Sequence, residues 1–167
     1  ATTYPDGLKQ AGMLVNESAK YKLGKPRTIN MPNLRLELLG RKYRHRYVTS
    51  HKGRSRLRGH ATDEVELMEI GEDPIVYNEG RHMKTRVRAW IDSSSGALWR
   101  AEVELRVPGD NRNPTWLRVD FALNKTLQIM VPVTMRERFN WVAHTGTSVA
   151  TYTNFRRFQT SARIVPQ

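Results

Sequence analysis

The chain has 167 residues, a formal net charge of +12 and no cysteine. This length suits a single domain, expected over residues 1–167, and the apolar fraction of 38% is sufficient for a core. The lack of cysteine excludes disulfides, thiolate metal sites and a cysteine nucleophile. No run of residues approaches the ~18 apolar positions of a membrane-spanning helix, and the first residues do not predict a signal peptide.

The positive charge is concentrated in the N-terminal third of the chain. Residues 1–60 contain 14 of the 28 Lys and Arg residues but only three of the 16 Asp and Glu residues. The remaining residues are therefore nearly neutral as a group. A regional positive field of this kind indicates an anionic partner, which is nucleic acid, an acidic lipid or an acidic protein surface.

Residues 1–40 are expected to form a short helix and an extended lead-in. Residues 6–22 carry apolar side chains at a spacing of three to four, and Asp6 precedes them as a capping residue. Gly24 and Pro26 end this predicted helix. Residues 33–39 stay ambiguous, because their leucines alternate as in a strand while Leu and Glu favour helices.

The rest of the chain, residues 41–167, has the alternation of an antiparallel meander with one apolar and one wet face. The clearest part is residues 85–107, where two alternating runs flank a Ser/Gly turn and predict a hairpin. A turn is also expected at residues 51–54. The predicted strands cover residues 43–48, 63–70, 85–92, 97–107, 117–123, 127–135 and 149–158.

The last predicted strand contains two phenylalanines, Phe155 and Phe158, that are three residues apart. Such a pair cannot face inward together on an unbroken strand, because successive side chains alternate between the two faces. We therefore expect the strand to end near Arg156 and Arg157, with both arginines in solvent.

The apolar side chains of these strands form one continuous wall in the prediction. This wall is either the core of the domain or, if the sheet is curved and only partly covered, the lining of a pocket for a lipid-like ligand. Core is the favoured interpretation, and the pattern alone does not choose. The wall comprises Val87, Ile91, Trp99, Val103, Leu117, Phe121, Ile129, Val131 and Met135.

Residues 41–60 form a cationic run without any carboxylate, and they are the candidate contact for an anionic partner. Tyr43, His45 and Tyr47 alternate within the run, so their side chains are expected to point into a sheet rather than toward nucleic-acid bases. We therefore favour a protein or lipid surface over nucleic acid. The cations of the run are Arg41, Lys42, Arg44, Arg46, Lys52, Arg54, Arg56 and Arg58.

No motif in the chain predicts catalysis, a metal site or a cofactor. The five histidines have none of the usual metal-ligand spacings, and three of them lie within the cationic run. The carboxylate pairs Glu64 with Glu66 and Glu102 with Glu104 could perform acid–base chemistry, but exposed strand faces produce such pairs routinely. No nucleophile motif or phosphate-binding loop accompanies them. The expected function is therefore non-catalytic.

Four segments together resemble a family of uncharacterised secreted proteins of acidobacterial type. The segments are YKLGKPRTINMPNLRLELL (21–39), VYNEGRHMKTRVRAWIDSSSGALWRAEVEL (76–105), VPVTMRERF (131–139) and ATYTNFRRF (150–158). Ala89 and Ser95 depart mildly from the pattern of that family. More distantly, the layout is similar to the periplasmic lipoprotein-carrier fold, whose curved sheet or half barrel holds an apolar pocket beneath its helices.

The resemblance implies a periplasmic or extracellular protein, and a further segment ahead of Ala1 in the native protein. Together with the strand pattern, it predicts a mainly β (α+β) fold, a curved antiparallel sheet or half barrel with a short N-terminal helix. The expected function is a docking or structural subunit of a larger oligomer or complex that uses the cationic run. The alternatives are a module that binds a lipid or another apolar ligand and, least favoured, a nucleic-acid-binding protein.

Overall fold

The computed structural model describes residues 38–72, 75–78, 81–109, 114–140 and 145–157. The helix predicted at residues 6–22 lies outside them, and no described helix is long and apolar enough to cross a membrane. In chain order the elements are η3 (Arg41–Arg46, a 3-10 helix), β1 (Tyr47–Leu57), β2 (His60–Glu69), β3 (Val76–Asn78), β4 (Arg81–Asp92), β5 (Leu98–Arg106), β6 (Thr115–Asn124), β7 (Ile129–Asn140) and β8 (Thr145–Thr151).

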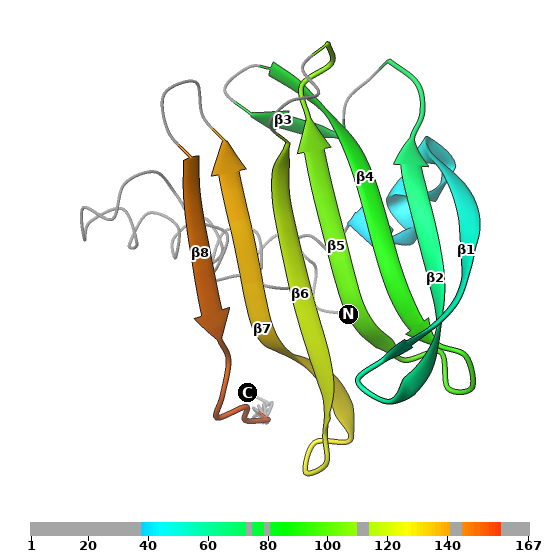
Figure 1. Cartoon of the computed structure of the whole chain (residues 1–167), viewed down its shortest axis with the longest axis vertical. Coiled ribbons are helices and arrows are strands. Elements are labelled where there is room, and N and C mark those ends of the chain that lie inside the picture. The colour runs from blue at the N-terminus through cyan, green and yellow to red at the C-terminus, as the bar shows by residue number, and fades with distance from the viewer. Residues whose placement is uncertain (1–37, 73–74, 79–80, 110–113, 141–144, 158–167) are drawn as a thin grey trace, which may run out of the picture.

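The described strands form one antiparallel meander, with the neighbour order β1-β2-β4-β5-β6-β7-β8. The short strand β3 lies off this path and pairs with β4. The sheet is curved and open, so that β1 and β8 are its two edges (Figure 1). This confirms the predicted mainly β class and the curved antiparallel sheet. The hairpin predicted within residues 85–107 is the pair β4 and β5.

One face of the sheet is the core, because alternating apolar side chains of the central strands point toward it. Val87 of β4 and Met135 of β7 are fully buried there. Burial of each such side chain stabilises the fold by roughly 1.5–3 kcal/mol. The buried core cluster consists of Leu38, Met83, Val87, Ala101, Val103, Leu105, Leu117, Val119, Phe121 and Met135.

Three β-bulges interrupt the regular ladder. They lie between His51 and Gly53 in β1, at Trp90 and Ile91 in the β4–β5 pair, and at Asp120 and Phe121 in the β6–β7 pair. A bulge bends its strand and increases the local twist. The curvature of the sheet follows from these irregularities together with the ordinary twist of its strands.

Two predictions at the start of the sheet are wrong. Residues 43–46 belong to the 3-10 helix η3, and the strand begins only at Tyr47, the first side chain of this stretch to be buried. The turn predicted at residues 51–54 is the bulge in β1, where Gly53 has a φ of +116° that other residues rarely adopt. The hairpin turn itself lies at Arg58 and Gly59.

The last strand lies earlier in the chain than predicted, since β8 ends at Thr151. The Tyr152 N–H donates one more hydrogen bond to the Val133 carbonyl, at 3.0 Å, and the chain then leaves the sheet. Asn154 has a φ of +58°, a left-handed conformation that ends an extended strand. Arg156 and Arg157 are exposed, as expected.

Candidate anion-binding groove

The face of the sheet opposite the core carries a grid of ion pairs, and we call it the charged face. It is formed by even-numbered residues of β2, β4 and β6, by Arg100, Glu102, Glu104 and Arg106 of β5, and by Arg136 and Arg138 of β7. Because strand registers align these residues, the side chains form rows that run across the strands. Two of these rows end on β7, where they border a groove in the surface of the domain.

The first row alternates in charge until it reaches β7. The ladder places Glu66, Arg88, Glu102, Arg118 and Arg136 side by side on successive strands. Each neighbouring pair up to Arg118 combines opposite charges. Arg118 and Arg136 then face each other as like charges, an arrangement that is destabilising unless an anion compensates it.

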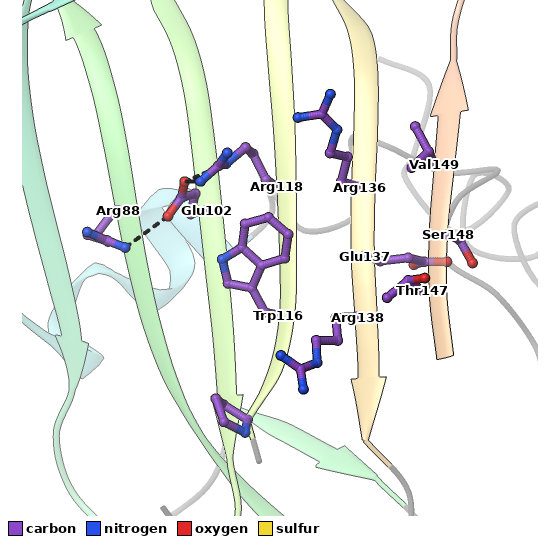
Figure 2. A pocket seen from close by; sticks show the side chains of 11 residues that line it. Arg88, Glu102, Trp116, Arg118, Arg136, Glu137, Arg138, Thr147, Ser148 and Val149 are labelled. Carbon is purple, nitrogen blue, oxygen red and sulfur yellow. Dashed lines mark hydrogen bonds and ion pairs between the residues drawn. The ribbon is translucent and has the colours of Figure 1, made fainter. Parts of the chain in front are cut away.

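Glu102 is the centre of this row and is clamped by two arginines (Figure 2). Its carboxylate accepts a hydrogen bond from Arg88 at 3.0 Å and from the Arg118 Nε at 2.6 Å. The side chain of Glu102 is only 5% exposed, so these contacts compensate for the loss of water. Arg118 is therefore held in a fixed position at the border of the groove.

The second row brings an aromatic side chain into the groove. The ladder aligns Arg86, Glu104, Trp116, Arg138 and Thr147 on successive strands. The Arg118 guanidinium lies 4.8 Å from the centre of the Trp116 ring, which is a cation–π distance. Figure 2 shows the indole between Arg118 and Arg138.

The arginines of β7 differ from the other arginines of the charged face. Those on the described parts of β4, β5 and β6 each contact a carboxylate, and they are Arg86, Arg88, Arg100, Arg106 and Arg118. Within the described ranges, no ion pair involves Arg136 or Arg138, and both are exposed. Among the described arginines of the charged face, those without a carboxylate partner therefore lie on β7.

A groove with a volume of about 560 Å³ lies at this place, between the centre of the sheet and its β8 edge. Its lining combines four arginines, the carboxylates Glu102 and Glu137, an indole ring, hydroxyl groups and Val149. Glu102 is held by Arg88 and Arg118, and the exposed arginines of β7 can hold an anionic group against the aromatic surface. The lining residues are Arg88, Glu102, Pro114, Trp116, Arg118, Arg136, Glu137, Arg138, Thr147, Ser148 and Val149 (Figure 2).

Elsewhere on the charged face, carboxylates are shared between two cations. Glu66 contacts both Lys52 and Arg86, and Asp120 contacts Arg100 at 2.7 Å and Arg58 at 3.6 Å. Burial alone would raise the pKa of Glu66, but hydrogen bonds from Lys52 and Arg86 outweigh it and hold the pKa below its usual value. Glu66 is therefore an ionised partner of the sheet rather than a free acid–base group.

The structure divides the predicted cationic run into two groups. Lys52, Arg54 and Arg58 contact acids of β2 or β6, so their charge is used within the domain. Arg46 is half-buried, while the remaining four cations are exposed on η3 and β1. Those exposed residues are Arg41, Lys42, Arg44 and Arg56. The run lies along β1, one edge of the sheet, whereas the groove adjoins the opposite edge.

The predicted apolar wall is mostly in the core, with departures at the bulge near Trp90 and at the start of β7. Trp99 follows the irregularity at Trp90 and Ile91, and its ring stacks on His60 at 3.7 Å. Ile129 opens β7 beside a turn and is 54% exposed. Ile91 is half-buried. The wall residues that are buried are Val87, Val103, Leu117, Phe121, Val131 and Met135.

Two histidines have structural contacts that the described residues show. His51 shares a 3.1 Å hydrogen bond with Asp63, and His60 stacks on Trp99, whose Nε1 donates to Asp92 at 3.4 Å. In the described ranges, no group of three or more His, Cys, Asp or Glu side chains is placed to hold a metal ion.

Sequence reasoning missed Trp116, Arg136 and Arg138 as candidate site residues. Their segments carry nearly balanced charge, so the average over the sequence hides the local excess. The available signal was the segment RER at residues 136–138, where two arginines two apart share one face of a strand. Only the register with β6 shows that Arg118 and Trp116, rather than carboxylates, lie opposite them.

The class defined by these observations is a mainly β domain with an open, curved antiparallel sheet and an arginine-rich groove. Comparison of the chain with protein families, curated proteins and solved structures gives no match. The resemblance to secreted acidobacterial-type proteins and the extracytoplasmic location therefore stay predictions.

Proposed function

We propose that the protein is a non-catalytic docking domain that binds an acidic segment of a protein partner through the arginine groove. The observation that carries the proposal is the pair Arg136 and Arg138, which are exposed and form no ion pair within the described ranges. In contrast, five other arginines of the charged face each contact a carboxylate, namely Arg86, Arg88, Arg100, Arg106 and Arg118. Guanidinium groups bind carboxylates in paired, directional hydrogen bonds. Trp116 supplies an apolar surface beside them.

The size and charge of the groove favour an acidic protein segment over a nucleic acid. A volume of about 560 Å³ suits a few side chains, not a duplex. Outside the groove, the charged face contains the carboxylates Glu64, Glu66, Glu104 and Asp120, each with a cation partner. A long polyanion that crossed the strands would therefore contact unpaired cations only in the groove. Its remaining phosphates would lie over cations that carboxylates already neutralise.

The groove also supports a binding role rather than a reaction. Its cations are arginines, which stay protonated in proteins and cannot act as general bases. The carboxylate of Glu102 is already occupied by Arg88 and Arg118. These side chains can position an anion beside the indole of Trp116.

The test is a comparison of two double variants with the same change in net charge. The first is Arg136→Gln with Arg138→Gln, in the groove. The second is Arg44→Gln with Arg56→Gln, two exposed cations of the predicted run on the opposite side of the sheet. Binding of a fluorescent, glutamate-rich peptide is measured by anisotropy at low and physiological salt, together with a single-stranded oligonucleotide and anionic lipid vesicles.

We expect the groove variant to weaken peptide binding on the order of 10- to 100-fold, because two charge-assisted contacts are lost. The control should lose only the few-fold effect of a lower net charge. Equal losses in both variants, or a larger loss in the control, would move the docking site to the cationic run. Tighter binding of the oligonucleotide or the vesicles than of the peptide would replace the protein partner by that class.

A further inference from the structure

Among the described strands, none pairs with the edge strand β8 on the side that faces away from β7. In the described sheet β7 is its only ladder neighbour, and the register from Thr145 to Thr151 has no bulge. The Tyr152 N–H points to β7, where it bonds to Val133. Since backbone groups of an antiparallel strand alternate in direction, the N–H and C=O groups of Thr147, Val149 and Thr151 point to the open side.

This edge lacks the features that usually prevent another strand from pairing. Edge strands are normally protected by charges, prolines or bulges. The opposite edge strand, β1, has a bulge and carries Lys52, Arg54 and Arg56. In contrast, β8 has the sequence TGTSVAT, with no charged residue, no proline and a regular register. Val149 is 65% exposed on it.

We propose that the acidic segment of the partner binds as an added antiparallel strand on β8, with two carboxylates two residues apart that face Arg136 and Arg138. This inference rests on the proposed function and specifies the form of its ligand. The backbone groups of β8 supply sequence-independent hydrogen bonds, and the arginines select the acidic residues.

The register explains the spacing of the two acids. Val149 lies opposite Arg136 and Thr147 lies opposite Arg138, so all four side chains share the charged face. Residues of an added strand that pair with Val149 and Thr147 would therefore project onto this face as well. Two strand spacings, about 10 Å, separate the backbones of β7 and the added strand, a gap that arginine and glutamate side chains reach across together.

A second copy of this chain does not supply the required carboxylates from its described edges. The strands at those edges are β1, with the sequence YVTSHKGRSRL, and β8 itself, and neither contains Asp or Glu. Pairing of two β8 strands would leave Arg136 and Arg138 without acids. Charge complementarity therefore favours an acidic segment of a different protein.

The test uses an extended heptapeptide of threonine and valine with glutamates on either side of its central residue. One derivative carries N-methyl groups on both glutamates, whose N–H groups would point at β8 in an antiparallel pair. The matched control carries one N-methyl group on the central residue, whose N–H would point away. A further peptide has the same composition but adjacent glutamates. Affinities are measured by isothermal titration, and amide hydrogen exchange of the protein is followed by NMR.

We expect N-methylation of the glutamates to weaken binding by about tenfold or more, through the loss of backbone hydrogen bonds, while the control peptide binds as the parent does. Adjacent glutamates should also weaken binding, by on the order of tenfold, because only one can face the arginines. The amides of Thr147, Val149 and Thr151 should gain protection from exchange.

The outcomes separate the inference from the proposed function. If the parent peptide binds in a manner that requires Arg136 and Arg138 but all methylated forms bind equally, strand addition is wrong and the anion groove remains. The same conclusion follows if the exchange of the β8 amides does not change. If no acidic peptide binds even at low salt, the proposed function itself is wrong. Self-association of the protein through β8 without peptide would identify a second copy as the occupant and overturn the inference.

Discussion

Replacement of Glu102 by glutamine tests whether the ion-pair grid stabilises the sheet. The carboxylate is 5% exposed and accepts hydrogen bonds from Arg88 at 3.0 Å and from the Arg118 Nε at 2.6 Å. A hydrogen bond to a charged group contributes about 1.5–3 kcal/mol. Two such bonds set an upper limit on what Glu102 contributes to the free energy of unfolding. The actual contribution is lower because water screens the partly exposed arginines, of which Arg88 is 39% and Arg118 is 28% exposed.

We therefore expect Glu102→Gln to reduce the free energy of unfolding by about 2–3 kcal/mol. For a chain of this size the melting temperature should fall by about 8 °C. The loss includes the repulsion among Arg88, Arg118 and Arg136 once the acid between them is neutral. Urea titration followed by tryptophan fluorescence measures the change, with circular dichroism to verify that the strand content is unchanged.

The matched control is Glu104→Gln, which makes the same chemical change two residues along β5 on the same face. Glu104 is 19% exposed and pairs with Arg106 of its own strand, so its replacement should cost less than about 1 kcal/mol. Equal effects of the two substitutions would show that burial between two arginines adds nothing, and would refute the reasoning. A stabilised Glu102→Gln variant would show that desolvation of this acid outweighs its ion pairs.

Two further predictions concern acid stability and the core. The lowered pKa of Glu66 means that its stabilising contribution is complete above the pKa of the unfolded chain, about 4.3, and is lost as the pH falls through the lower folded value. Stability measured between pH 5 and 2 should therefore fall more steeply in the native protein than in Glu66→Gln, and parallel curves would contradict this. Met135→Ala should lower the unfolding free energy by about 2–5 kcal/mol, because Met135 is fully buried in the core. A loss below about 1 kcal/mol in a urea titration would show that the core closes around the missing side chain.

The largest difference between the prediction from sequence and the structure is the location of the cations that are available to a partner. The run from Arg41 to Arg58 dominates any average along the chain, yet Lys52 and Arg58 are neutralised by Glu66 and Asp120. The groove arginines lie in a segment of nearly balanced charge. Ion pairing joins residues that are distant in sequence, so a regional charge count does not show which cations remain available to a partner.

The sequence by itself determined the strand pattern. Val87, Val103 and Leu117 face the core because a side-chain period of two, with apolar residues on one face, permits only one buried orientation. The Ser/Gly turn after Asp92 joins β4 to β5 as the local residues predict. Class, meander order and most core residues follow from such short-range chemistry.

Only the tertiary structure decided the register, the bulges and the groove. A bulge at Gly53 stands where a turn was predicted, and a second bulge near Trp90 turns Trp99 toward His60. Both arise because pairing with the twisted neighbouring strands overrides the local alternation of side chains. Arg136 meets Arg118 instead of an acid through a pairing that depends on the length of the turn between β6 and β7. Such contacts depend on the pairing of whole strands, so no single segment contains the information that places them.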